Sequence, residues 1–156
     1  MAEGRVVLAL ALLATWLGAA VLFACVVAPA AFAVLPSREL AGALVGRVLP
    51  VLFLSGIALG VAAGALTVRG RGRAPSVAAF AVAVACAVAQ FGVGPRIGRL
   101  RAEIGPSLAA LDASDPRRAA FGRLHALSVA WLGVGVLASA AALGLLWLAM
   151  RQRSVP

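Results

Sequence analysis

Four long apolar runs alternate along the chain with short segments that carry nearly all of its charge. Each run approaches or exceeds the roughly 20 residues that an α-helix needs to cross about 30 Å of hydrocarbon. The runs predict membrane spans at about residues 6–35, 40–68, 74–95 and 119–150. The pattern therefore predicts an all-α integral membrane protein, a four-helix transmembrane bundle that forms a single domain over residues 1–156.

Local signals indicate where two of these helices begin. Ser37 is a favourable N-cap, and Glu39 follows in the first turn, where a negative charge suits the positive end of the helix. Asp115 and Pro116 give the fourth span an N-cap acid followed by proline at the first helical position. We expect the fourth helix to begin about two turns before the hydrocarbon does.

The connection between the third and fourth spans is predicted to contain a short amphipathic helix. Its apolar residues recur at helical spacing, while Arg96, Arg99 and Glu103 fall on another face. We expect this helix to lie along the membrane interface, and Gly105-Pro106 to divide the segment into two pieces.

The sequence also contains a weak internal repeat. The segment at Cys25 aligns with the segment at Cys86, and the segment at Arg47 aligns with that at Arg123. Two repeated helical hairpins related by an axis along the membrane normal would give this pattern. Arg47 and Arg123 would then lie at equal depth on the same side of the membrane.

The composition excludes a water-soluble fold, and it therefore also decides which partner the positive net charge indicates. The chain is 63% hydrophobic, with a mean hydropathy of +1.06, whereas soluble domains are roughly 45–50% apolar. The formal net charge of +9 would suggest a nucleic-acid partner for a soluble protein. Here the arginines flank the spans, where they favour anionic lipid headgroups. We expect the lipid bilayer as the partner, and no nucleic acid.

The arginines also bear on orientation. Six lie on the side of the two termini and eight on the opposite side, but the turn at residues 69–73 is the densest short cluster. Because the positive-inside rule counts basic residues in short loops, we favour both termini in the cytoplasm. The expected location is the cell membrane, as a multi-pass protein.

Two features of the apolar runs predict close packing and local irregularity. Gly56, Gly60 and Gly64 form a ridge of small residues in the second span, which suits packing within the bundle or, as the alternative, a homodimer face. Pro29 and Pro95, like Pro50, each remove a helical hydrogen bond. Gln90, the only amide inside a predicted span, is expected to satisfy the carbonyl group that Pro29 frees.

One end of the predicted bundle collects ionisable side chains. Arg47, Arg123 and His125 lie there, with Glu39 and Arg96 nearby. Such groups at the margin of a span are costly unless they pair, snorkel or face a polar cavity. Salt bridges between helix starts are one interpretation. The other is a pocket for an anionic lipid or small anion, which guanidinium groups bind with two parallel hydrogen bonds.

No catalytic motif is present, and we expect neither a metal nor another cofactor. His125 is the only histidine, so a bis-histidine haem cannot form within one chain, and the two cysteines lack metal-binding spacing. The interpretation is a non-enzymatic protein that binds an anionic lipid or small solute, as a transport or accessory subunit. A haem- or metal-linked redox protein that uses His125, and a purely structural subunit of a membrane complex, are the alternatives.

Two stretches resemble a known family. VVAPAAFAVLPSRELAGALVGRVLP and DPRRAAFGRLHALSV, together with the four-span layout, resemble the transmembrane protein 205-like family. That family typically has His-Gly-Leu-Ser in the second stretch, followed further on by an asparagine. His125, Leu127 and Ser128 match, whereas Ala126 replaces the glycine and Leu132 stands where the asparagine is expected. The resemblance implies a four-helix membrane protein and specifies no biochemical activity.

Overall fold

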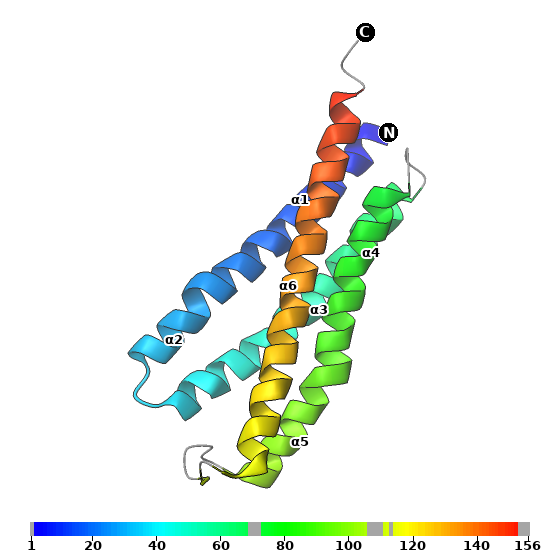
Figure 1. Ribbon diagram of the computed structural model, residues 1–156. Coiled ribbons are helices and arrows are strands. Elements are labelled where there is room, and N and C mark those ends of the chain that lie inside the picture. The colour runs from blue at the N-terminus through cyan, green and yellow to red at the C-terminus, as the bar shows by residue number, and fades with distance from the viewer. Residues whose placement is uncertain (1, 69–72, 106–110, 113, 153–156) are drawn as a thin grey trace.

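The computed structural model describes residues 2–68, 73–105, 111–112 and 114–152, and every regular element within these ranges is a helix. Four continuous helical segments are long and apolar enough to cross a membrane: Glu3–Val34, Arg38–Thr67, Ala74–Ile104 and Pro116–Arg151. They form an elongated bundle with both termini at one end (Figure 1). The predicted all-α four-helix transmembrane bundle is confirmed.

The four spans contain eight helical elements. In chain order these are α1 (Ala2–Leu22), η1 (Phe23–Val27), α2 (Ala28–Val34), α3 (Arg38–Thr67), α4 (Ala74–Ala87), η2 (Val88–Val93), α5 (Gly94–Ile104) and α6 (Pro116–Arg151). The second and fourth spans are each one α-helix. The first and third spans are interrupted by π-helical turns, η1 and η2.

The predicted helix starts are confirmed. The Ser37 hydroxyl accepts a hydrogen bond from the Leu40 N–H at 3.2 Å, and the Asp115 carboxylate accepts one from the Arg117 N–H at 2.8 Å. Helix α5 ends before Gly105, whose φ of 83° favours glycine. The expected break is therefore present there, while the second piece and the turn at residues 69–72 lie outside the described residues.

Each π-helical turn is separated from a following proline by one residue. The Ala28 N–H donates to the Phe23 carbonyl, and the Gly94 N–H donates to the Ala89 carbonyl, each five residues back. The next residue is proline in both cases, which supplies no N–H. The two turns correspond at an offset of 66 residues, against 61 for the alignment of the cysteines. The first and third spans therefore correspond in structure at the register of the prolines and not at that of the cysteines.

The amphipathic helix expected after the third span is α5, and it begins without a break from η2. Helix α5 packs against α6 and extends the third span. Helix α5 is continuous with the third span, because the π-helical turn accommodates Pro95 and lets the chain continue in helical form.

Trp16 is the largest side chain buried in the core, with 1% of its surface exposed. Its indole N–H donates to the Leu52 carbonyl oxygen at 3.0 Å, which joins α1 to α3. A Cβ atom on Gly135 of α6 would lie 2.9 Å from the indole ring, so glycine leaves the space that the ring fills. Ser139 joins α6 to α1 in the same way, by donating to the Leu13 carbonyl at 3.2 Å.

The glycine ridge of α3 is used inside the bundle. A Cβ atom would lie 2.5 Å from the Cys86 Sγ at Gly56, 2.9 Å from the Ala79 oxygen at Gly60, and 2.8 Å from the Phe80 ring at Gly64. All three glycines are buried against the first or third span. In the structure this ridge therefore faces neighbouring spans of the same chain.

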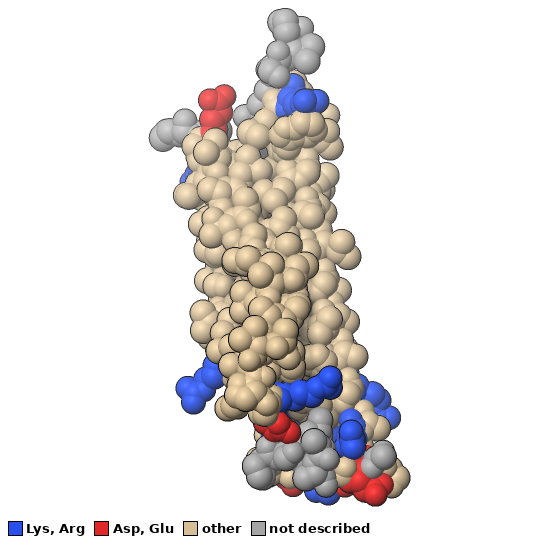
Figure 2. Space-filling model, turned by 90° about the vertical axis from the view of Figure 1, so that its left-hand side faces the viewer, with Lys and Arg blue, Asp and Glu red and all other residues tan. Residues whose placement is uncertain are grey.

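The lateral surface is apolar over most of the length of the bundle. Figure 2 shows an almost uninterrupted belt of uncharged residues between two charged ends. Large apolar side chains on this belt are strongly exposed, among them Val34, Val51 and Leu137. Such a continuous apolar surface suits contact with lipid chains and not with water.

The bundle divides into two pairs of helices at the end opposite the termini. There α2 packs on α3, and α5 packs on α6. The two pairs diverge toward this end in Figure 1.

Candidate functional site

The end opposite the termini, which we name the charged end, holds most of the ionisable side chains. Helix α3 begins there, α5 ends there and α6 begins there. The end carries eight arginines and four acids: Arg38, Arg47, Arg96, Arg99, Arg101, Arg117, Arg118 and Arg123, with Glu39, Glu103, Asp112 and Asp115. Basic and acidic side chains lie together at the lower end of Figure 2. The excess of cations makes this end suited to anions.

The residues predicted to form a site lie at the charged end but are spread over different helices. Arg47 is exposed on α3, Arg123 and His125 are exposed on α6, and Glu39 is half-buried in the first turn of α3. Arg96 is exposed on α5 and donates to the Gly92 carbonyl of its own span at 2.7 Å. Among the contacts within the described ranges, none joins Arg47, Arg123 and His125 to one another.

Phe121 on α6 contacts two charged or titratable side chains. Its ring is parallel to the His125 ring, with centroids 6.5 Å apart. The Arg101 guanidinium carbon lies 5.4 Å from the centroid of the same phenyl ring, within the range of a cation–π interaction. The aromatic ring therefore positions Arg101 of α5 beside α6.

A pocket of about 320 Å³ lies between α3, the η2–α5 segment and α6. Its walls are mostly apolar, with three polar side chains. The lining residues are Gly46, Leu49, Pro50, Phe53, Ala89, Gln90, Gly94, Pro95, Ile97, Gly98, Arg101 and Ser128. The volume is at the lower end of the range of small-molecule sites, about 300–1,000 Å³.

Arg101 extends from α5 across to α3. Both of its terminal nitrogens donate to the Gly42 carbonyl oxygen, each at 3.3 Å. A Cβ atom would lie 3.0 Å from this guanidinium at Gly42 and 3.3 Å at Gly46. The two glycines, one helical turn apart, thus leave a shallow space on α3 for the arginine head, and Arg101 connects the two diverging pairs of helices.

Gln90 occupies a different place from the one predicted. It lines the pocket on η2, half-buried, and its amide makes no hydrogen bond to any residue in the described part of the chain. The expected contact with the Cys25 carbonyl is therefore not formed, because η2 turns this side chain toward α3 and α6.

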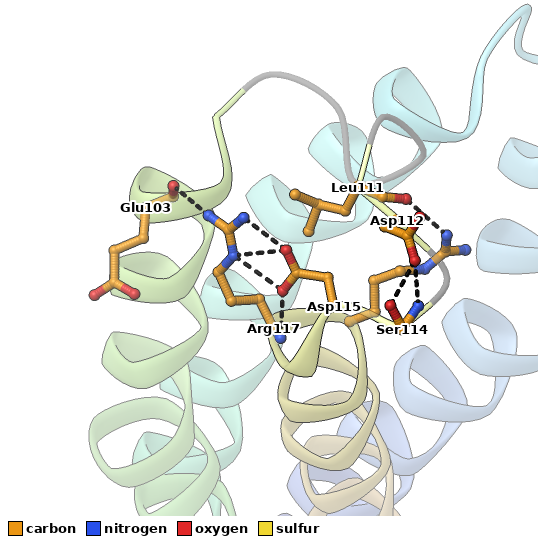
Figure 3. Close-up of polar contacts among 7 residues, drawn as sticks. Glu103, Leu111, Asp112, Ser114, Asp115 and Arg117 are labelled. Carbon is orange, nitrogen blue, oxygen red and sulfur yellow. Dashed lines mark hydrogen bonds and ion pairs between the residues drawn. The ribbon is translucent and has the colours of Figure 1, made fainter.

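The start of α6 is held by a local polar network (Figure 3). Arg117 forms an ion pair with Asp115 at 2.7 Å and donates to the Glu103 carbonyl at 3.5 Å, while the Glu103 carboxylate points away. Arg118 donates to the Leu111 carbonyl at 3.1 Å. The pair between Arg117 and Asp115 is the only ion pair formed between described residues. It joins neighbours in sequence, so it does not connect the starts of separate helices.

Two carboxylates in this network have pKa values below their ordinary range. The Arg117 side chain and backbone N–H hydrogen-bond to Asp115 and lower the pKa of its carboxyl group. The Ser114 hydroxyl and N–H do the same for the pKa of Asp112. Both acids therefore remain negatively charged at neutral pH and neutralise part of the excess of arginines.

The described residues contain no group of three or more His, Cys, Asp or Glu side chains that suits a metal ion. Cys86 is buried on α4 and Cys25 is exposed on η1. The exposed guanidinium groups at the charged end are of the kind that pair with anions. No nucleophile paired with a base is found there among the residues that the structure describes.

Arg101 is the residue that the sequence analysis did not single out. It counted there only as one of the eight arginines on the side opposite the termini, because its guanidinium contact depends on how α5 is rotated about its axis. The available signal was the pair Gly42 and Gly46, which stand one helical turn apart in the second span. Small residues at that spacing indicate a close neighbour, although they do not reveal that the neighbour is an arginine.

Comparison with known proteins gives a family and no close relative. Neither the curated proteins nor the solved structures contain a significant match to this chain. Residues 11–106, which include the first three spans almost entirely, match a family described as Domain of unknown function (DUF4149). The matched segment covers more than half of the chain, and the protein is therefore a member of the DUF4149 family with a four-helix membrane bundle.

Proposed function

We propose that the protein binds an anionic lipid or a small anion at its charged end, as a transport or accessory subunit in the membrane. The observation that carries the proposal is the excess of arginines over acids at the charged end, eight against four. Beside them, between α3, the η2–α5 segment and α6, lies a pocket that has Arg101 among its lining residues. A cation beside a mostly apolar pocket fits a ligand that has both an anionic group and an apolar part.

The charge around the pocket supports the same function. Arg47 and Arg123 are exposed on the two helices that flank it, α3 and α6. Exposed guanidinium groups attract anionic headgroups and form paired hydrogen bonds with phosphate or carboxylate oxygens. His125, exposed two residues after Arg123, adds a ring N–H group that can donate a hydrogen bond to an anionic ligand.

The test is native mass spectrometry of gently solubilised protein, together with an absorption spectrum of the same sample. The wild type is expected to retain an anionic lipid or small anion, and the Arg47→Ala, Arg123→Ala double variant should lose most of it. The matched control is the Arg5→Ala, Arg73→Ala double variant, which removes the same charge at the opposite end.

Equal ligand retention by the two double variants would contradict the proposal. It would assign the arginines of the charged end to membrane anchoring alone. A Soret band in the absorption spectrum would instead favour the haem-linked alternative that uses His125.

We also propose a relationship to the transmembrane protein 205-like family, which rests on two segments. Residues 26–50 lie within the range that matches DUF4149, and residues 115–129 lie outside it. In the second segment, Ser128 lines the pocket. A relative of that family with the same pocket lining would support the relationship.

A further inference from the structure

We infer that the pocket binds one chain of a membrane phospholipid whose headgroup is anionic, and that Arg101 holds the phosphate of that lipid. The inference rests on the proposed function and deepens it, because it names the ligand class and the residue that recognises it. Neither Arg47 nor Arg123 lines the pocket. Arg101 is therefore a different residue from the two arginines that are changed in the test of the proposed function.

The pocket lining is divided by chemistry. Leu49, Pro50 and Phe53 of α3 and Ile97 of α5 supply apolar walls. Arg101, one helical turn beyond Ile97, lies further toward the charged end and is exposed. A ligand that fills the site therefore needs an apolar part toward the interior of the bundle and an anionic group at the charged end.

The hydrogen bonds that Arg101 makes in the structure are weak, and its other contact is the Phe121 ring. Its two hydrogen bonds go to one neutral carbonyl oxygen, that of Gly42, at 3.3 Å each, whereas N–H···O bonds are usually about 2.9–3.0 Å long. No carboxylate in the described ranges forms an ion pair with it. A phosphate diester offers two anionic oxygens that match the guanidinium fork at roughly 2.7–2.9 Å. The phosphate is thus the stronger partner and replaces the carbonyl.

The depth of Arg101 fits the headgroup layer. The third span, Ala74–Ile104, has 31 residues and is about 46 Å long at 1.5 Å per residue. This exceeds the hydrocarbon thickness of about 30 Å, so the ends of the span reach the headgroups. Arg101 is three residues from the end of the span. Gly94 and Ile97, one to two turns earlier, lie toward the level of the acyl chains.

The pocket volume decides how much of the lipid enters. About 320 Å³ is close to the minimum for a small-molecule site, so the space admits one chain and not a whole phospholipid. The second chain remains in the bilayer, against the exposed apolar side chains of the belt. Gln90 and Ser128 stand beside the chain as the other polar groups of the lining and offer hydrogen bonds to an ester carbonyl.

The first experiment titrates the purified protein with phosphatidylglycerol or phosphatidylcholine and follows the bound lipid by native mass spectrometry. Arg101→Gln should weaken phosphatidylglycerol binding at least about tenfold, because it removes a charged bidentate contact. Arg99→Gln is the matched control: the same charge on the same helix, also exposed, but outside the pocket lining. Phosphatidylcholine has the same phosphate but also a quaternary ammonium group, which the surrounding arginines repel, so it should bind the wild type and Arg99→Gln more weakly than phosphatidylglycerol does.

A second variant tests the chain-binding part of the site. A Cβ atom on Gly98 meets nothing within 4 Å, yet Gly98 lines the pocket. Gly98→Phe should therefore fold and fill the space. It should weaken phosphatidylglycerol binding as strongly as Arg101→Gln does, but leave binding of inorganic phosphate unchanged. Arg101→Gln should weaken the binding of both ligands.

Three outcomes would overturn the inference. Equal loss in Arg99→Gln and Arg101→Gln would show non-specific attraction by the charged end. Unchanged lipid binding in Gly98→Phe, with inorganic phosphate lost in Arg101→Gln, would identify a free anion as the ligand. Lipid lost in the Arg47→Ala, Arg123→Ala variant but kept in Arg101→Gln would leave the proposed function standing and remove this site from it.

Discussion

Among the glycines of the α3 ridge, Gly56 has the closest neighbours in the core. An added Cβ atom would lie 2.5 Å from the Cys86 Sγ and 2.6 Å from the Trp16 Nε1. Trp16 cannot move away easily, because its N–H is bonded to the Leu52 carbonyl and its side chain is fully buried. Gly56→Ala should therefore lower the free energy of unfolding by about 1–3 kcal/mol, the usual cost of overpacking.

The measurement is reversible unfolding of the protein in detergent micelles, followed by tryptophan fluorescence. Gly18→Ala on α1 is the control, because its Cβ atom would meet nothing within 4 Å. It should leave stability unchanged or raise it by up to about 1 kcal/mol, since alanine is the better helix former. Equal stability of the two variants would show that the ridge packs less closely than the structure indicates.

The sequence predicted the charged end at the level of residue type but not of residue contacts. Arg47 and Arg123 were placed at the correct end because hydrophobic runs determine depth in the membrane. Depth does not determine rotation about the helix axis, and rotation decides which arginine faces the pocket. Arg101 faces it because α5 continues from η2 and packs on α6, where Phe121 lies.

At the scale of elements, the spans and their starts were predictable and the π-helical turns were not. Span lengths follow from apolar runs, and Ser37 and Asp115 are caps whose side chains satisfy free N–H groups. The prolines indicated irregularity at η1 and η2, since proline removes a backbone donor. Whether the chain then kinks, ends or widens into a π-helical turn depends on its neighbours, as the uninterrupted course of α3 through Pro50 shows.

The cap at the start of α6 should make stability depend on pH. The pKa of Asp115 is lowered in the folded state by its hydrogen bonds to Arg117. A carboxyl group with a depressed folded pKa stabilises the protein above its unfolded pKa of about 3.9, and this stabilisation is lost as the pH falls through the lower folded value. Asp115→Asn keeps a cap but loses the ion pair. It should be less stable than the wild type at pH 7, and the difference should shrink below about pH 4.

This prediction is checked by measuring unfolding midpoints of both proteins between pH 3 and pH 7 in micelles of an uncharged detergent. Glu3→Gln, at the opposite end of the bundle, is the comparison for a general effect of removing one negative charge. A gap between Asp115→Asn and the wild type that stays constant over the whole range would argue against the ion pair with Arg117 as its cause.

At the scale of the whole molecule, the bundle is closed at the end of the termini and divided at the charged end. Trp16 joins the first span to the second, Ser139 joins the fourth to the first, and the glycine ridge packs the second span against the third. Toward the charged end α2 packs with α3 and α5 with α6, and Arg101 crosses between the pairs. This division was not predictable from hydropathy, because it depends on how helices diverge and not on their length. It creates the space in which the pocket forms.

The same arrangement predicts the topology in the membrane. Four spans place both termini on one side, and the dense arginine cluster at residues 69–73 favours the cytoplasm for that side. The test uses single cysteines at Glu3, Ser114 and Gln152, in a chain with Cys25 and Cys86 replaced by alanine. Their labelling shows whether the two termini lie on one side of the membrane and whether that side is the cytoplasm. These three positions are exposed, with Ser114 at the opposite end from the others.

A membrane-impermeant maleimide applied to intact cells should label Ser114→Cys, whereas Glu3→Cys and Gln152→Cys should react only after the membrane is opened. The reverse pattern would keep the four-span fold and overturn the orientation, and the arginines of the charged end would then lie on the cytoplasmic side. Labelling of Glu3→Cys and Gln152→Cys from different sides would contradict the bundle itself, because an even number of spans cannot separate its two ends.

The orientation matters for the lipid site, since anionic lipids are enriched in the cytoplasmic leaflet. With both termini in the cytoplasm, Arg101 faces the opposite leaflet, where anionic lipids are scarcer, so the pocket needs a higher affinity for such a lipid to remain occupied.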